Sequence, residues 1–338
     1  KWRNLEIKIA DKSVGGNNPA FIVAEAGINH NGNVRIAKKM VEKAKEIGAD
    51  AIKFQTFKAS DFTTPSSKYF KIFKQVELSY EDFGELSDHA KHNDIIFFST
   101  PSSQEAVDVL HKLNVPAYKI ASGDLTNIPL LEYSAAKKHP MIISTGLANM
   151  KEVFRSVRAV EKIGNRKIIL MHSVSTYPTP YVEANMKVIQ KMSESFDYPI
   201  GYSDNGSDLL VPVIAVAVGS KIIEKHFTLN RRMKGPDHML SGDPRQFKNL
   251  IDDIRKTEEI LGDGVKRCQP SELRNIKQIR KSLTATVTIE KNSKLTYDAI
   301  GIKRPAFGIE PKFLKKVVGK TAVRRINKDN SIRWSDIR

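Results

Sequence analysis

The chain has 338 residues and a net charge of +17, with 40% hydrophobic and 28% charged residues, which is ordinary for a folded globular protein. No apolar run approaches the roughly 20 residues that span a bilayer, which excludes a protein with membrane-spanning helices. The single cysteine, Cys268, excludes an internal disulfide and indicates a reducing, cytoplasmic location.

The positive charge is spread along the chain and is not gathered in blocks. There is no zinc-finger spacing and no basic-aromatic RNA-binding motif, so we expect no nucleic-acid partner. A basic surface with a cleft for a phosphorylated or other anionic substrate explains this charge better.

Short apolar runs alternate with segments of helical periodicity along most of the chain. Residues 1–18 are polar and predict an irregular lead-in, and residues 56–78 form a longer polar and aromatic insertion. The expected strands are 21–24, 51–55, 95–98, 117–120, 141–143, 168–171, 199–202 and one that opens at 222–223. The expected helices are 36–47, 80–92, 103–113, 129–138, 151–163, 183–195, 209–218 and 245–261.

Eight strand–helix repeats predict an α/β fold, a (β/α)8 TIM barrel of the usual length of about 250 residues. A doubly wound open sheet is the alternative, but no GxGxxG motif follows the first strand, which weakens a dinucleotide-binding interpretation. We expect the barrel over residues 1–261 and a linker with a short helix over 262–282. Residues 284–289 alternate like a strand, so 283–338 predict a small, mainly β domain that docking or dimerisation supports.

Polar residues stand at nearly every expected strand end, where the active sites of such barrels lie. One or two could cap a strand, but a set on every strand predicts a site. The set comprises Glu25, Lys53, Gln55, Ser99, Lys119, Ser122, Asp124, Ser144, His172, Ser175, Tyr177, Ser203, Asp204, Glu224 and His226. The stretch 221–238 adds Arg231, Arg232, Asp237 and His238 in the loop after the last strand.

Lys53 and Lys119 lie within apolar strands, where a buried ammonium group is costly unless it meets an anion. Three interpretations stay open. Each lysine could form an ion pair with Glu25 or Glu224, could clamp a phosphate or carboxylate, or could form a Schiff base with a carbonyl substrate.

His226 could bind a divalent metal with Glu25 and nearby carboxylates, and His30 and His172 are close to rim positions. No HExxH spacing is present. Proton transfer is the second chemical role for His226, and a satisfied histidine at a strand end is the structural alternative.

The chain resembles the sialic acid (nonulosonate) synthases in stretches that run in the family's order across nearly its whole length. They are AEAGINHNG (24–32), IKFQTF (52–57), FFSTP (97–101), YKIASGD (118–124), IISTG (142–146), YPTPY (177–181), GYSD (201–204), EKHFT (224–228), GPDH (235–238) and IKRP (302–305). Residues 283–338 resemble the family's antifreeze-like (SAF) domain.

This resemblance implies a barrel with an SAF domain that works as a homodimer with exchanged C-terminal domains. It also implies that phosphoenolpyruvate condenses with an N-acetylmannosamine-type sugar to give a nine-carbon acid and phosphate, with Mn2+ or Mg2+ polarising the aldehyde. The acceptor is expected to be N-acetylmannosamine, giving N-acetylneuraminate. A 2,4-diacetamido-6-deoxy sugar, giving legionaminate, and a phosphorylated acceptor are alternatives.

The resemblance also assigns site residues by position. Glu25, Lys53, Tyr177, Asp124 and Asp237 are expected to be catalytic. Lys119, Ser122, Ser144, Ser175, Ser203 and Gln55 are expected to bind substrate. Arg304 corresponds to an arginine that reaches into the partner's barrel to meet the N-acyl group of the sugar.

Two positions depart from the family pattern. The usual metal-binding histidine after GYSD is Asn205 here, whereas the second, His226, remains; Ser175 replaces a common asparagine beside the phosphate. Because asparagine is a poor neutral ligand for manganese, the metal could bind weakly through His226, catalysis could proceed without metal, or activity could be lost or redirected. A sugar- or anion-binding protein without catalysis is the alternative function.

Overall fold

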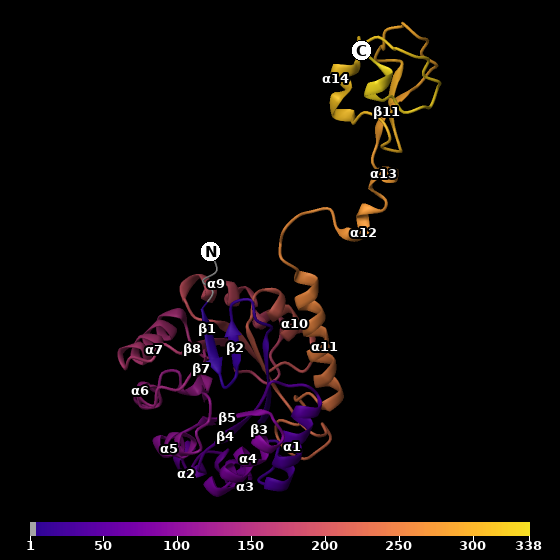
Figure 1. Cartoon of the computed structure of the whole chain (residues 1–338). Helices are drawn as coiled ribbons and strands as arrows, with labels where there is room; N and C mark the ends of the chain where they lie inside the picture. Colours follow the sequence, from indigo (N-terminus) through magenta and orange to yellow (C-terminus); the bar gives the residue numbers. More distant parts are fainter. Residues whose placement is uncertain (1–4) are drawn as a thin grey trace. The chain divides into compact units, whose positions relative to one another are not determined.

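The computed structural model describes residues 5–338 and divides them into two compact units, the first ending at Gly262 and the second beginning at Asp263. The first unit is a closed barrel of eight parallel strands, which confirms the predicted TIM barrel (Figure 1). The strands are β3 (Phe21–Gly27), β4 (Ala51–Thr56), β5 (Ile96–Pro101), β6 (Tyr118–Ile120), β7 (Met141–Ser144), β8 (Ile168–Ser173), β9 (Ile200–Asp204) and β10 (Ile222–His226).

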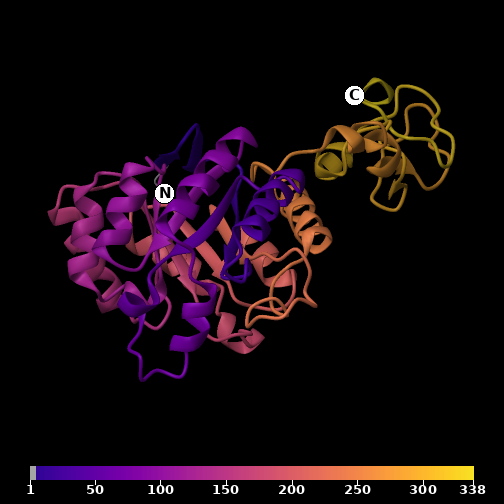
Figure 2. The ribbon, with the colours of Figure 1, turned by 90° about the horizontal axis from the view of Figure 1, so that it is seen from below.

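Helices surround these strands, as Figure 2 shows from below. They are α1 (Val34–Glu46), α4 (Tyr80–His92), α5 (Gln104–Lys112), α6 (Ile128–Ala136), α7 (Met150–Lys162), α8 (Tyr181–Ala184), α9 (Lys187–Ser195), α10 (Leu210–Ala217) and α11 (Pro244–Leu261). The strands are buried on both faces, which explains why they read as continuous apolar runs in the sequence. Within the described residues no helix is both long and apolar enough to cross a membrane.

The expected lead-in over residues 1–18 is wrong for the part that the structure describes. Strands β1 (Glu6–Ile9) and β2 (Lys12–Gly15) form an antiparallel hairpin. Its apolar residues, Ile7, Ile9 and Val14, are buried in the barrel core, while the residues between them face outward. Three apolar residues are too few to reveal the alternation of a strand within a polar stretch.

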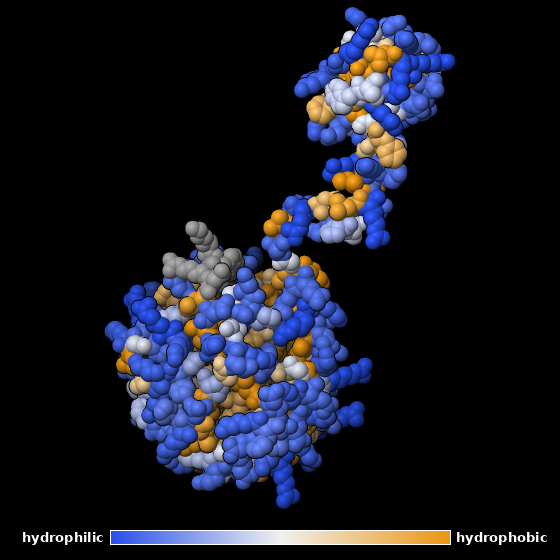
Figure 3. Space-filling view, in the orientation of Figure 1, coloured by the Kyte–Doolittle hydropathy of each residue, from blue (hydrophilic) through white to orange (hydrophobic). Residues whose placement is uncertain are grey.

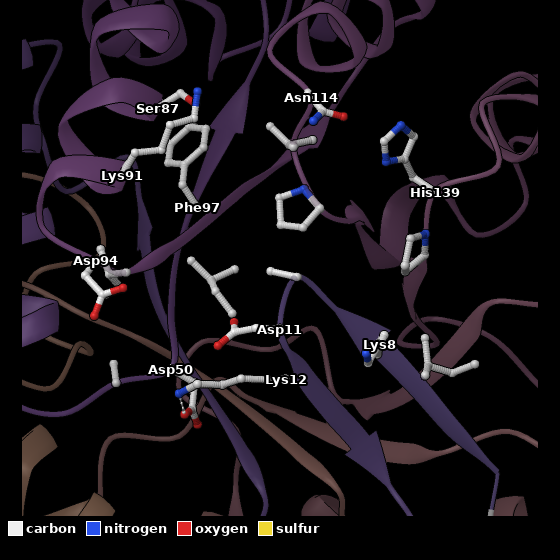
Figure 4. A pocket seen from close by; sticks show the side chains of 18 of the residues that line it. Lys8, Asp11, Lys12, Asp50, Ser87, Lys91, Asp94, Phe97, Asn114 and His139 are labelled. Carbon is white, nitrogen blue, oxygen red and sulfur yellow. Dashed lines mark hydrogen bonds and ion pairs between the residues drawn. The ribbon is translucent and has the colours of Figure 1, made fainter.

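This hairpin lines a cavity of about 990 Å³ together with segments that precede barrel strands, so the cavity lies at the amino ends of the strands. Figure 4 shows Lys12 of the hairpin beside Asp50, with which it forms an ion pair. Asp50 Oδ2 also accepts a hydrogen bond from Ile22 N over 2.7 Å. The hairpin is therefore tied to the start of β3, at the end of the barrel opposite to the polar strand ends.

The insertion over 56–78 contains two short helices, α2 (Ala59–Phe62) and α3 (Phe70–Val76). Their aromatic side chains pack together, with the Phe62 and Phe73 ring centroids 4.7 Å apart and those of Phe57 and Phe73 5.6 Å apart. This cluster sits on the loop after β4, so it forms an apolar rim beside the carboxyl ends of the strands.

The second unit has its own small core, which includes Leu283, Leu295, Ile309 and Ile326. Its elements are α12 (Pro270–Leu273), α13 (Ile276–Ile279), β11 (Ser282–Ala285), β12 (Ile300–Lys303) and α14 (Leu314–Val317). Strand β11 is shorter than the alternation over 284–289 suggested, because Ile289 forms only an isolated bridge with Ile326. The expected linker holds two short helices where one was expected.

Candidate functional site

Side chains from all eight barrel strands or the loops that follow them line a cavity of about 280 Å³ at the carboxyl ends of the strands. The expected site residues that line it are Glu25, Lys53, Gln55, Lys119, Ser122, Asp124, Ser144, Ser175, Tyr177, Ser203, Asn205, Glu224 and His226. The structure thus brings together residues from distant parts of the chain, because alternate residues of a barrel strand face its interior.

Two lysines and two carboxylates form the charged centre of this cavity. Lys53 Nζ lies 2.7 Å from Glu25 Oε2 and 3.6 Å from Glu224 Oε1, and it donates to Thr100 Oγ1 over 2.9 Å. Lys119 Nζ lies 3.4 Å from Glu224 Oε1. All four charged side chains are at most 6% exposed. The ion pairs that the sequence left open are therefore present, and both lysines still face the cavity.

The two lysines differ in their proton affinity. Burial opposes the charged form of Lys53, but the charges of Glu224 and Glu25 outweigh it and raise the pKa of this lysine. Burial lowers the pKa of Lys119, because Glu224 compensates only in part and the charge of Lys53 adds to the effect. Burial also opposes the charged form of Glu224, yet Lys119 and Lys53 lower its pKa. The centre is thus a balanced cluster with Lys119 as its more weakly protonated lysine.

Hydroxyl groups cluster around Gly146, in the loop after β7. The Oγ atom of Ser122 accepts a hydrogen bond from Gly146 N over 3.1 Å. A Cβ atom on Gly146 would lie 2.5 Å from Ser175 Oγ and 2.7 Å from Ser122 Oγ, so only glycine leaves room for both hydroxyls. Ser144 Oγ is buried without a hydrogen-bond partner. These hydroxyls and the Lys119 ammonium can receive an oxyanion such as phosphate.

Tyr177 and His226 form the other side of the cavity, with ring centroids 5.7 Å apart in an edge-on arrangement. Burial and the carboxylates of Asp237, Glu25 and Glu224 raise the pKa of Tyr177, so its hydroxyl can donate a hydrogen bond at neutral pH. Asp237 is near enough to act on Tyr177 but does not line the cavity. Gln55 Nε2 donates to Glu25 Oε1 over 3.0 Å and orients this carboxylate.

Asp124 lines the cavity from the 3-10 turn after β6, where its hydrogen bond with Asn127 spans 3.1 Å. Burial raises the pKa of Asp124, although the hydrogen bond from Asn127 opposes this effect. Arg304, by contrast, lies on the second unit and is exposed.

The donors around His226 do not fit a conventional metal centre. His226 Nδ1 is buried without a hydrogen-bond partner and is free to act as one ligand. Asn205 is its cross-strand neighbour, because the register pairs Lys225 with Asp204, but the Asn205 side-chain nitrogen donates to Val174 O. Glu25 already contacts Lys53 and Gln55. Over residues 5–338, no three His, Cys, Asp or Glu side chains are grouped to hold an ion.

Several residues that the sequence placed near the rim point elsewhere. Lys225 forms a buried ion pair with Asp204, and neither residue lines the cavity. Asp204 borders a separate, smaller pocket. His172 Nε2 donates a hydrogen bond to Ala184 O over 2.8 Å, because a carbonyl oxygen can only accept. His238 is fully buried beside Thr228. Thr100 and Ser173 are lining residues whose part in the site the sequence did not single out.

His30 is also buried away from the cavity, against Phe54, and burial lowers its pKa to about 4. Because the unfolded chain then binds the proton more tightly, stability is full above about pH 6.5 and falls as the pH drops toward 4. We expect a loss of about 3 kcal/mol in the free energy of unfolding over this range from His30 alone. Denaturant unfolding at pH 7 and pH 4 should show a smaller difference in His30→Gln; an equal difference would contradict this assignment.

Comparison with known proteins adds an independent observation. The NeuB family profile matches residues 40–266, and the SAF domain profile matches residues 280–338. Both matches agree with the resemblance drawn from the motifs.

The relatives match this chain over most of its length. The chain is 46% identical to the uncharacterized protein MJ1065 of Methanocaldococcus jannaschii over 98% of each chain. It is 38% identical to the N,N'-diacetyllegionaminic acid synthase of Legionella pneumophila over 96% of this chain and 97% of that protein. The crystal structure of an N-acetylneuraminic acid synthetase from Leptospira borgpetersenii is 35% identical, with a TM-score of 0.78 over 81% of this chain and 95% of that chain.

Proposed function

Since this chain belongs to the NeuB family of phosphoenolpyruvate-condensing nonulosonic acid synthases, we propose that it joins phosphoenolpyruvate to an N-acetylmannosamine-type sugar. The products are a nine-carbon acid, N-acetylneuraminate for the simplest acceptor, and inorganic phosphate. The observation that carries the proposal is the single cavity that Lys53, Lys119 and the hydroxyls near Gly146 line together with Glu25, Tyr177 and His226.

The reaction balances with one water molecule consumed. Carbon 3 of phosphoenolpyruvate attacks the aldehyde carbon of the open-chain sugar, and the aldehyde oxygen takes up a proton. Water adds to carbon 2 of the resulting oxocarbenium ion and loses a proton. The tetrahedral intermediate then breaks its bond to the phosphate oxygen, and phosphate leaves.

The residues divide between these steps by their chemistry. Lys53, Lys119 and the serine hydroxyls are suited to bind the phosphate and carboxylate of phosphoenolpyruvate, because ammonium and hydroxyl donors match oxyanions. Tyr177 and Asp124 can donate protons near the aldehyde oxygen. Glu25 and His226 can accept the proton that water loses.

We assign no step to a metal, because the donor set around His226 offers one free imidazole nitrogen. We therefore expect turnover to persist, within about threefold, when the enzyme is treated with EDTA and freed of divalent ions. The control is Asn205→His, which places a second imidazole beside His226 and should raise manganese affinity in a titration. Loss of wild-type activity in EDTA and its return with manganese would restore the metal to the mechanism.

The acceptor has two candidates. The diacetamido-6-deoxy sugar is the alternative acceptor, because Phe57 and Phe62 line the cavity and suit additional methyl groups. The relative from Legionella pneumophila is named for the corresponding product. N-acetylmannosamine needs less apolar contact and remains the simpler acceptor.

We also propose that the enzyme works in the cytoplasm as a homodimer with exchanged C-terminal domains. Apolar side chains are exposed along the stretch that joins the two units, as Figure 3 shows in its hydrophobic colour. They are Ile260, Leu261, Val265, Leu273 and Ile279, each at least 50% exposed. In the proposed dimer a second copy of the chain covers these side chains. Exposed apolar side chains that gather in one stretch are typical of interaction surfaces.

The test of the proposed function is phosphate release from phosphoenolpyruvate with each acceptor, with the product identified by mass spectrometry. Release with a nine-carbon acid from N-acetylmannosamine is the expected result. A product from the diacetamido sugar alone would identify a legionaminate-type enzyme. Binding of phosphoenolpyruvate without release from either acceptor would overturn catalysis and leave an anion-binding protein.

A further inference from the structure

Asn205 forms hydrogen bonds with both ends of the loop 174–179, which we call the tyrosine loop because it carries Tyr177. Its side-chain Nδ2 donates to Val174 O over 2.8 Å and to Ser173 Oγ over 3.4 Å. Its backbone O accepts a hydrogen bond from Thr179 N over 3.2 Å. One residue at the end of β9 therefore holds the start and the end of a loop that follows β8.

The tyrosine loop has little other support. Val174 and Thr179 are half-buried, Thr176 and Pro178 are exposed, and Tyr177 is about half exposed, although its hydroxyl group is desolvated enough to raise its pKa. Thr179 Oγ1 donates to Val174 O over 3.2 Å and to Thr176 O over 3.0 Å, which closes the base of the loop. With so little burial, apolar packing cannot fix the loop, and its position depends on these hydrogen bonds.

The loop brings two groups to the cavity. Ser175 Oγ and Ser122 Oγ both lie close to Gly146, and the rings of Tyr177 and His226 pack edge-on. A shift of about 1 Å in the loop would separate the two serine hydroxyls, since they converge on one point.

We propose that Asn205 is a positioning residue that holds the tyrosine loop so that Ser175 and Tyr177 face the phosphate-bearing substrate. The inference rests on the proposed function for the identity of that substrate. It requires an N–H donor at position 205, because Val174 O is a carbonyl and can only accept. In this chain the side-chain amide of Asn205 supplies that donor, and a histidine at the same position would have a different shape.

Two variants separate the donor from the size and charge of the side chain. Asn205→Asp keeps the size but has no donor when ionised, and Asn205→Ala removes the donor without adding charge. The matched control is Asn165→Ala, because Asn165 is buried and its Nδ2 donates to His139 O over 2.8 Å at the amino end of β8. Thr179→Val removes the second donor to Val174 O. It takes the place of the Asn205 variants in the experiment if these do not fold.

We expect both Asn205 variants to raise the KM for phosphoenolpyruvate about tenfold, the size of one buried hydrogen bond, and to lower kcat as well, because the loop carries the proton donor Tyr177. The KM for the sugar should stay unchanged. Hydrogen exchange of peptides covering 174–179 should become about tenfold faster in the Asn205 variants and stay as in wild type in Asn165→Ala. Thr179→Val should shift the same two quantities in the same direction by a smaller factor.

Unchanged exchange in the tyrosine loop, or Asn205→Asp behaving as wild type, would overturn the inference. So would equal effects of Asn205→Ala and Asn165→Ala on the KM. If the wild-type chain failed to condense the two substrates, the proposed function would fall. Hydrogen exchange and calorimetric titration with phosphoenolpyruvate would still decide whether Asn205 positions the loop.

Discussion

Lys53→Met is expected to lower kcat by a factor of about 100–1000 and to destabilise the protein by about 3–5 kcal/mol. The loss of activity follows because the ammonium group faces the cavity, where it would neutralise phosphoenolpyruvate. The loss of stability follows because Glu25 and Glu224 would be left as buried carboxylates without their shared partner. Phosphate release and denaturant unfolding of the same preparation measure the two effects.

Lys225→Met is the matched control for this variant. Lys225 is as buried as Lys53 and pairs with Asp204, but it does not line the cavity. We expect a similar loss of stability and a kcat, per folded molecule, within about threefold of wild type. Equal loss of kcat in the two variants would mean that Lys53 acts through stability and not through the substrate.

Arg304→Ala is expected to raise the KM for the sugar about 10–100-fold, the range for a hydrogen bond to a charged group, and to leave the KM for phosphoenolpyruvate unchanged. Arg304 is exposed on the second unit and would reach the N-acyl group from a partner chain. Lys303→Ala is the control, because the neighbouring Lys303 forms an ion pair with Asp329 within that unit. Steady-state kinetics with each substrate varied in turn provides the measurement.

The exchanged dimer can be tested by combining the two damaged chains. Lys53→Met and Arg304→Ala chains carrying different tags are co-expressed, and the hybrid dimer is purified through both tags. In an exchanged dimer one barrel keeps its own Lys53 and receives an intact Arg304, so about half of the wild-type rate returns. The rates are compared at a sugar concentration near the wild-type KM, where Arg304→Ala is slow. A hybrid no faster there than its Arg304→Ala parent would show that each barrel uses the arginine of its own chain.

The barrel could be predicted from the sequence because its signal is repeated. Eight apolar runs with intervening helical periodicity admit few architectures, and polar residues at the strand ends indicate one shared site. The hairpin of β1 and β2 could not be found this way, because Ile7, Ile9 and Val14 are its only buried apolar residues and occur in a polar stretch. Its burial depends on the barrel core, which a local pattern does not contain.

The site residues were predictable from the sequence, and ion pairs of Lys53 and Lys119 with Glu25 or Glu224 were one of the open interpretations. The sequence groups Glu224, Lys225 and His226 together, whereas the alternation of a strand sends Lys225 away from the cavity and its two neighbours into it. This alternation of side chains can be predicted from the sequence. The bridging position of Glu224 between two lysines could not, because it depends on the distances between β4, β6 and β10.

The charge balance of the buried centre couples substrate binding to protons. Burial lowers the pKa of Lys119, and Glu224, which also pairs with Lys53, compensates only in part, so Lys119 releases its proton at a lower pH than an ordinary lysine. An incoming phosphate raises that pKa again, and anion binding and protonation of Lys119 therefore favour each other. The affinity for phosphoenolpyruvate should fall as the pH rises toward the alkaline range, with protons taken up on binding there. The pH dependence of phosphoenolpyruvate binding would thus arise from a buried lysine.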